Sequence, residues 1–259
     1  MSNDHRSVGA VAAPALAAAP RAAHPEGGRR RGCAGPPAVL RPSEYTAALI
    51  QALRARAKWV RGAAVLEIGS GSGVVLAALA DMGAASLCGV DIENDAVESG
   101  ALLLGELGFG DKASFHHGDM WQPVRGRRFD LIAANLPQFP TETAAMPGRL
   151  LTWSAGGLGG RALLDPFLEA LPSHLAPGGR AVITHNGFVS LARSRKIVEG
   201  CGLAFRIATT VLVHIGAEKL DLMPPAVLRD EAARSIHRYG SYAFADLHIV
   251  EIGSEAGLA

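Results

Sequence analysis

An apolar run that enters a glycine-rich turn constrains this chain more than any other feature. Residues 65–73 read V-L-E-I-G-S-G-S-G, and a second apolar run ends in G-V-D-I at residues 89–92. Such a βαβ unit binds a nucleoside, because glycines let backbone N–H groups approach the ligand and the acid accepts hydrogen bonds from the ribose hydroxyls. The sequence therefore predicts a nucleoside cofactor.

The glycine spacing indicates which nucleoside is bound. The turn reads G-x-G-x-G rather than the G-x-G-x-x-G of dinucleotide-binding proteins, and an acid precedes it. It resembles the first motif of the class I S-adenosylmethionine (SAM) methyltransferases, E/D-x-G-x-G-x-G. The resemblance implies that the turn holds the aminoacyl end of SAM and that the later acid holds the ribose. The residues implied to bind the cofactor are Glu67, Gly69, Ser70, Gly71, Gly73, Asp91 and Ile92.

Strand-like and helix-like segments alternate along most of the chain. Helical spacing is found at 42–59, 73–82, 94–107, 163–175, 190–201 and 225–238. Runs typical of strands occupy 64–68, 86–92, 113–117, 129–135, 180–185, 204–214 and 242–252. The alternation predicts a doubly wound α/β fold with a mostly parallel sheet of seven strands. The resemblance implies an antiparallel last strand, and segment 217–241 is interpreted as an insertion.

Composition limits the classes of function. The chain has 259 residues, 49% of them hydrophobic, which is enough for one main domain, placed here at 38–259. Its 25 Lys+Arg against 24 Asp+Glu give no strong basic field, so a nucleic-acid partner is disfavoured. Three isolated cysteines indicate no disulfide framework and no metal site. No apolar stretch approaches the about 18 residues of a membrane span, so a cytoplasmic protein is expected. The oligomeric state is left open.

The first 37 residues differ in composition from the rest. They are dominated by Ala, Pro, Gly and Arg and contain few large apolar side chains. Such a segment cannot offset the entropy of ordering its backbone, so 1–37 is predicted to be a disordered tail.

A second informative segment follows the fourth predicted strand. Residues 129–138 read F-D-L-I-A-A-N-L-P-Q, which delivers Asn135 to the edge of the sheet where ligands of open α/β folds bind. The Asn135 carbonyl and nearby backbone carbonyls can hold an amide or amine N–H and orient its lone pair. Such a site accelerates transfer by positioning, and Asn135 is the candidate catalytic residue.

Residues 135–138 resemble the N-P-P-Y motif of methyltransferases that modify glutamine amides or base amino groups. The Asn and the second Pro match, while Leu136 and Gln138 depart from the motif. An aromatic platform for a planar acceptor is therefore missing. The resemblance implies an acceptor site made by Asn135, Leu136, Pro137 and Gln138, with Tyr45 as a further candidate.

Other segments extend the resemblance over 39–252. Residues 39–46, V-L-R-P-S-E-Y-T, resemble the P-R-P-x-T-E entry segment of the release-factor type of protein-glutamine methyltransferases, which makes Arg41 a candidate cofactor contact. Residues 156–160 stand where that family has a glycine-rich segment. Asp119 stands where the family contacts the adenine amino group, and Met120 is grouped with it. The helical recognition domain of release-factor enzymes is replaced here by the tail, which disfavours a ribosomal factor as substrate.

Three functions remain open on the sequence. The first is methyl transfer from SAM to a nitrogen of a small molecule, an amino-acid derivative or a protein amide. The second is cyclisation of SAM itself, in which its α-amine attacks its own γ-carbon to give azetidine-2-carboxylate and methylthioadenosine. The third is a non-catalytic SAM-binding protein, which is disfavoured because the chain keeps intact the residues Glu67, Gly69, Gly71, Gly73, Asp91 and Asn135.

Overall fold

The structure is a computed structural model that describes residues 41–141 and 154–258. The chain divides into two units, residues 1–35 and 36–259, and every described residue belongs to the second unit. The predicted tail at 1–37 therefore lies almost wholly in the first unit and outside the described residues. The limits of the 38–259 domain stay a prediction.

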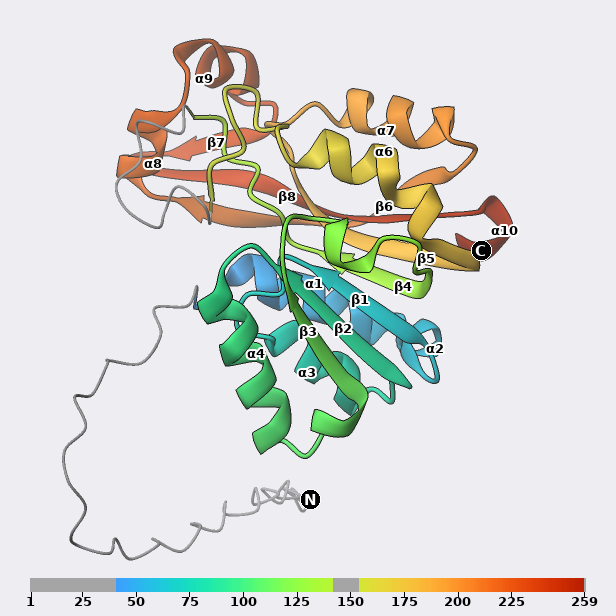
Figure 1. The fold of residues 1–259 in the computed structure, drawn as a ribbon. Helices are drawn as coiled ribbons and strands as arrows, with labels where there is room; N and C mark the ends of the chain where they lie inside the picture. The colour runs from blue at the N-terminus through green and yellow to red at the C-terminus, as the bar shows by residue number, and fades with distance from the viewer. Residues whose placement is uncertain (1–40, 142–153, 259) are drawn as a thin grey trace, which may run out of the picture. The chain divides into compact units, whose positions relative to one another are not determined.

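A single mixed sheet organises the described chain (Figure 1). Its strands follow the order β3-β2-β1-β4-β5-β8-β6, and β7 pairs with β8 beside that path. β1 to β5 pair in parallel, whereas β8 runs antiparallel between β5 and β6. The strands are β1 Ala64–Ile68, β2 Ser86–Asp91, β3 Ala113–His117, β4 Phe129–Ala134, β5 Leu175–Asn186, β6 Ala204–Ile215, β7 Ile236–Tyr239 and β8 Tyr242–Gly253. The predicted fold class is confirmed, with one short strand beyond the expected seven.

Helices cover both faces of this sheet (Figure 1). α1, α3 and α4 lie on one face, and α6 and α7 lie on the other. The helices are α1 Glu44–Ala55, α2 Ala57–Val60, α3 Val74–Asp81, α4 Asn94–Glu106, α6 Leu164–His174, α7 Leu191–Gly200, α8 Ala217–Leu222, α9 Pro225–Glu231 and α10 Glu255–Leu258. Short 3₁₀ helices span Gly110–Lys112 and Gln122–Val124. The core lies between sheet and helices, where Leu66, Leu131 and Phe167 are fully buried.

The first helix follows from its local sequence. Ser43 forms a capping box with Thr46, which satisfies backbone N–H groups that a helix start leaves unpaired. Leu49 and Leu53 then recur at helical spacing and are fully buried. The predicted helix at 42–59 is interrupted at Arg56, so α1 and the single turn α2 share this range.

The prediction of a helix over 225–238 is wrong in its second half. α9 ends at Glu231, and Ala233 adopts a left-handed backbone conformation with φ 61° that a helix cannot contain. The chain then forms β7, which returns into β8 through the short turn at 240–241. The turn signal at Gly240, with φ 63°, outweighs the helical spacing of the preceding residues.

One edge of β8 pairs with two strands, β5 and β7. Its residues 247–253 pair with β5, and its residues 242–245 pair with β7. β7 therefore continues the sheet beyond Asn186, the last residue of β5. Because β1 to β5 are parallel, this extension lies on the side where their carboxyl ends meet.

None of the helices in residues 41–141 and 154–258 combines the length and apolar composition needed to cross a membrane.

The close approach of α3 to α4 generates the first prediction. A Cβ at Gly73, which has φ 77°, would lie 2.7 Å from the Cα of Gly100. We expect Gly73→Ala to lower the free energy of unfolding by about 1–3 kcal/mol, because both the conformation and the space exclude a side chain. Gly105 in α4 has open space, so Gly105→Ala is expected to raise stability by about 0.5–1 kcal/mol. Chemical denaturation measures both, and an equally stable Gly73→Ala would contradict the packing argument.

Candidate active site

Four polar or glycine positions lie side by side at the carboxyl edge of the parallel strands. Asp91 ends β2, Gly69 follows β1, Asn135 follows β4, and Thr184 lies near the end of β5. Neighbouring strands are about 5 Å apart, so Asp91 and Asn135 stand roughly 10 Å apart across the edge. This alignment rests on the residue pairs Ile68–Val90, Ile68–Ala134 and Ala134–Ile183.

The glycine-rich turn is built by its own backbone. Gly69, Gly71 and Gly73 all have positive φ, at 72°, 50° and 77°, which residues with a Cβ rarely adopt. The N–H groups of Gly69 and Ser70 donate to the Val90 carbonyl at 2.8 and 3.1 Å, which fastens the turn to β2. A Cβ at Gly71 would meet nothing within 4 Å, so the turn is open there to a ligand.

Asp91 is held by the same turn. One carboxylate oxygen accepts the Gly71 N–H at 2.8 Å, and the other accepts the Glu93 N–H at 2.9 Å. Burial raises the pKa of Asp91, while these backbone N–H groups oppose the rise. Each carboxylate oxygen keeps a free lone pair, so Asp91 can accept the two ribose hydroxyls that the sequence assigned to it.

Two buried polar atoms under the turn have no partner among the described residues. They are Oε2 of Glu67, which is 2% exposed, and Oγ of Ser70. Burial, and secondarily the charge of Asp91, raises the pKa of Glu67 well above its usual range, although the backbone N–H of Leu76 lowers it. Buried polar groups are normally hydrogen-bonded, so these two atoms fit a polar ligand such as the aminoacyl end of SAM.

The proposed adenine contacts stand at the ends of β2 and β3. Ile92 is 54% exposed, which leaves an apolar surface beside Asp91. Its carbonyl lies 3.0 Å from Nε2 of His117, which fixes the β3 end against the β2 end. Asp119 follows and is exposed, and Met120 has φ 47°. The structure brings these residues to one side of the edge, and their contacts with adenine stay a prediction.

Segment 135–138 is bound to the end of β5. The Thr184 hydroxyl donates to Oδ1 of Asn135 at 2.7 Å. Leu136 is buried, and its Cδ2 lies 3.8 Å from the place that a Cβ on Gly69 would occupy. The two functional segments therefore stand next to each other at the ends of paired strands. Pro137, between Leu136 and Gln138, is half-buried.

Gln138 has a different environment from the one expected of a substrate contact. It is 3% exposed, its Nε2 donates to the Thr184 carbonyl at 2.8 Å, and its Oε1 accepts the Asn186 N–H at 3.0 Å. Both ends of the amide thus satisfy backbone groups of β5 that β4 is too short to reach. Gln138 therefore has a framework position: its amide is bonded to β5. The substrate contact expected from the sequence is not formed by these polar atoms, because they face β5.

Tyr45 and Arg41 are placed by the start of α1. The Tyr45 hydroxyl donates to Oδ1 of Asn186 at 2.9 Å, and burial raises the pKa of this phenol. Tyr45 therefore joins α1 to the end of β5, next to segment 135–138. Arg41 precedes α1 and is exposed, so its cofactor contact stays a prediction.

The glycine-rich segment 156–160 packs against Gln138. A Cβ at Gly156 would lie 2.8 Å from the Gln138 Cα, and one at Gly160 would lie 2.5 Å from its carbonyl oxygen. The segment also pairs with the chain that leaves the site, since the Gly156 N–H donates to the Phe139 carbonyl at 2.8 Å. These glycines act by close backbone approach.

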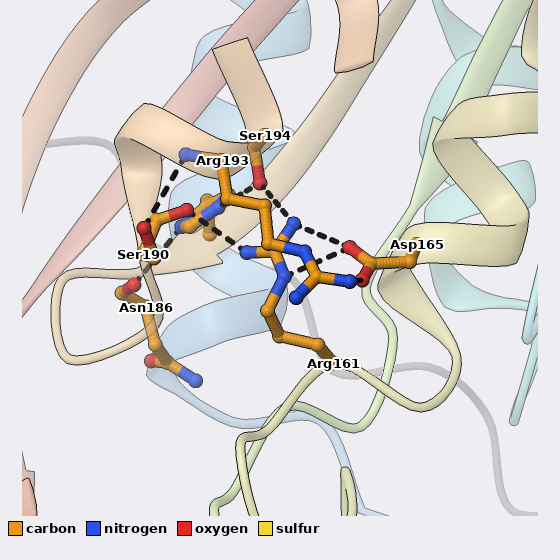
Figure 2. Close-up of polar contacts among 7 residues, drawn as sticks. Arg161, Asp165, Asn186, Ser190, Arg193 and Ser194 are labelled. Carbon is orange, nitrogen blue, oxygen red and sulfur yellow. Dashed lines mark hydrogen bonds and ion pairs between the residues drawn. The ribbon is translucent and has the colours of Figure 1, made fainter. Parts of the chain in front are cut away.

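Arg161, which follows this segment, fastens it to α7 (Figure 2). Its guanidinium contacts the Asp165 carboxylate at 2.5 Å, the Ser190 carbonyl at 2.9 Å and the Ser194 hydroxyl at 2.9 Å. Arg193 contacts the other Asp165 oxygen at 2.6 Å. The network fastens the start of α6 to the start of α7.

His185 continues this network toward the site. It is fully buried, with Nε2 2.8 Å from the Ser194 Oγ and Nδ1 2.9 Å from the Asn186 carbonyl. Burial lowers the pKa of His185 to about 4, so the ring is neutral at physiological pH. Its Nδ1 carries the proton because the facing carbonyl can only accept. In residues 41–141 and 154–258, no group of three or more His, Cys, Asp or Glu side chains is arranged to hold a metal ion.

Sequence reasoning missed the contribution of β5. Thr184 and Asn186 both bond to segment 135–138, yet neither belongs to a recognised motif. A signal was present, since the apolar run of 181–183 ends abruptly in Thr-His-Asn. Polar residues at the carboxyl end of a buried parallel strand point to a ligand-binding edge.

Comparison with known proteins places these features in context. The sequence profile of a methyltransferase domain matches residues 65–147. A protein of Methanocaldococcus jannaschii that is assigned as a protein N5-glutamine methyltransferase is 34% identical over 188 residues, which cover 71% of this chain and 89% of that protein. A release factor glutamine methyltransferase of Geobacter sulfurreducens is 31% identical over 55% of this chain, and a ribosomal protein uL3 glutamine methyltransferase of Bradyrhizobium diazoefficiens is 30% identical over 52%. The matches span 51% and 42% of those two enzymes, about half of their length.

Solved structures share the fold. The YcgJ protein of Bacillus subtilis has a TM-score of 0.55 at 15% identity and covers 79% of this chain and 98% of its own. A 16S rRNA methyltransferase of T. thermophilus was solved in complex with AdoMet and guanosine. It has a TM-score of 0.50 at 18% identity, and the match covers 83% of this chain and 44% of that chain. The family match identifies the cofactor as SAM, and the buried polar atoms of Glu67 and Ser70 are compatible with it.

Asp91 generates a prediction on cofactor binding. Asp91→Ala should weaken SAM binding by about 1.5–3 kcal/mol, the range for hydrogen bonds to a charged group. Isothermal titration calorimetry measures the change. Asp111→Ala, an exposed position at the opposite edge of the sheet, is the control and should bind as the parent does. Unchanged affinity in Asp91→Ala would overturn the ribose assignment.

Glu67 generates a prediction on pH dependence. Its folded pKa is raised, so the favourable contribution of its protonated form is present below the ordinary carboxyl pKa and is lost as pH rises through the folded pKa. Glu67→Gln removes this loss. We expect the SAM-free variant to melt about 2–4 °C above the parent at neutral pH, the shift that roughly 1 kcal/mol gives a domain of this size, with the gap closing in mild acid. Thermal scans across pH measure it, and the exposed Glu106→Gln should show no gap; identical melting at every pH would contradict the prediction.

Proposed function

This chain belongs to the class I SAM-dependent methyltransferases, with relatives that methylate glutamine, and from that premise we propose that it methylates the side-chain amide nitrogen of a glutamine in a polypeptide. The observation that carries the proposal is the adjacency of the two functional segments. Gly69 and Asn135 directly follow Ile68 and Ala134, which are paired on neighbouring strands. An acceptor nitrogen held by Asn135 would therefore lie next to the cofactor.

The roles of the residues follow from their positions. Glu67, Ser70 and the glycine turn would hold the aminoacyl end of SAM, and Asp91 would hold its ribose. When bound, SAM supplies an electrophilic methyl carbon. Oδ1 of Asn135 accepts one N–H of the acceptor amide and turns the nitrogen toward that carbon. In the transfer, a bond would form between the nitrogen and the methyl carbon while the carbon–sulfur bond of SAM breaks. The proton released from the nitrogen would pass to solvent water, and S-adenosylhomocysteine would be the second product.

An amide acceptor fits this edge better than a nucleobase. A base requires a planar aromatic surface for stacking, and position 138 is a buried Gln whose amide is bonded to β5. An amide requires only hydrogen-bond acceptors for its N–H groups, and Asn135 offers one. The three sequence relatives reported above are all named as glutamine methyltransferases, so they give no support to the cyclisation of SAM.

Isotope-labelled SAM identifies the acceptor. The purified protein is incubated with methyl-labelled SAM and a cell extract separated into protein, nucleic-acid and small-molecule fractions. We expect the label on glutamine side chains in digested protein, together with S-adenosylhomocysteine. Label confined to nucleic acid or small molecules would refute the proposal. Enzyme-dependent methylthioadenosine from SAM alone, together with azetidine-2-carboxylate, would favour the cyclase instead.

Removal of the Asn135 amide separates chemistry from cofactor binding. Asn135→Ala should lower turnover on the labelled acceptor by about 10²-fold, because the nucleophilic nitrogen loses its near-attack position, while the SAM dissociation constant stays within about twofold. Steady-state kinetics and calorimetry measure the two quantities. Gln51→Ala, which removes an exposed amide from α1, should change neither. Turnover within a factor of two of the parent would assign Asn135 a structural role only.

A further inference from the structure

The side chain of Thr184 has one polar partner in the described structure, and that partner is Asn135. Thr184 is 1% exposed and points its hydroxyl at Oδ1 of Asn135 at 2.7 Å. The pairing of Ala134 with Ile183 sets the two residues beside each other on adjacent strands. The contact is therefore built by the register of the sheet.

An asparagine amide needs such a contact if it is to act as an acceptor. Its oxygen and nitrogen ends have nearly the same size and shape, but only the oxygen end can accept an N–H. If the amide turned over, its NH₂ group would meet the N–H of the acceptor. The same rotation would leave the buried Thr184 hydroxyl proton without the acceptor it now has, which is unfavourable.

Threonine is suited to this task because its side chain is stiff. A β-branched residue in a strand has few accessible χ1 rotamers, so the backbone fixes the position of Oγ1, and the hydroxyl proton turns toward the acceptor within reach. The backbone of Thr184 is fixed in turn, since its carbonyl accepts Nε2 of Gln138 at 2.8 Å. Gln138 also accepts the Asn186 N–H at 3.0 Å, so the far end of segment 135–138 is bound to the same strand.

We propose that Thr184 is a positioning residue for methyl transfer, whose hydroxyl fixes the orientation of the Asn135 amide so that Oδ1 remains the acceptor for the substrate N–H. The inference rests on the proposed function for the identity of the substrate. The orientation of Asn135 itself can be measured without any substrate.

The first test is spectroscopic and uses the full chain with SAM bound. The side-chain amide signals of Asn135 in ¹⁵N-labelled protein are assigned by their loss in Asn135→Ala. We expect one sharp pair in the parent and in Thr184→Ser. Thr184→Val should give a second pair or broadened signals. Asn135 signals in Thr184→Val that match the parent would overturn the proposal, whether or not an acceptor has been found.

The second test is kinetic and uses a glutamine peptide from a protein marked by labelled SAM. Thr184→Val should lower kcat by about 10-fold to 100-fold, with KM for the peptide and SAM affinity within about twofold. Thr184→Ser should recover most of the loss. Thr209→Val on the exposed part of β6 is the matched control and should behave as the parent.

A double-variant comparison separates positioning from a general structural effect. In an Asn135→Ala background no amide remains to be oriented, so adding Thr184→Val should change turnover by less than about twofold. An undiminished effect of Thr184→Val in that background, or a parent-like kcat in Thr184→Val alone, would overturn the proposal. The absence of any glutamine acceptor for the parent would count against the proposed function and would leave the spectroscopic result to decide the orientation.

Discussion

The parallel register of four strands is the constraint on which the site depends. Asp91, Gly69, Asn135 and Thr184 are far apart in the sequence, and none is close to another except through the pairing of β2, β1, β4 and β5. A slip of one residue would turn every side chain of a strand to the opposite face of the sheet. A slip would therefore move buried apolar side chains out of the core, which is unfavourable. The apolar packing on both faces in this way keeps the site residues aligned.

Much of this arrangement could be predicted from the sequence. The glycine turn and Asp91 sit in a local βαβ unit, and local patterns determine their positions. The framework position of Gln138 could not be predicted, since it depends on a hydrogen bond to Thr184 of β5, which lies 46 residues later. The same holds for Thr184. The β7 strand was missed for a different reason: helical spacing continued through residues whose backbone the Gly240 turn and the pairing with β8 redirect.

The buried polar atoms under the glycine turn lower the stability of the folded chain. Glu67 and Ser70 have buried polar atoms without partners among residues 41–141 and 154–258, and the charge of Asp91 acts on Glu67. A chain selected only for stability would place apolar side chains here. The polar atoms of Glu67 and Ser70 fit a bound polar molecule that would supply the missing hydrogen bonds, and a ligand that binds only the folded chain raises its stability.

The two halves of β8 pair with different strands along one edge. Its second half is held by β5 and belongs to the sheet that aligns the cofactor edge, whereas its first half is held by β7 and the segment before it. Insertions or replacements between Gly216 and Gly240 can alter the protruding hairpin while the pairing of 247–253 is preserved. The segment between Gly216 and Gly240 can thus change in length and sequence during evolution while the strands that align the cofactor edge keep their pairing.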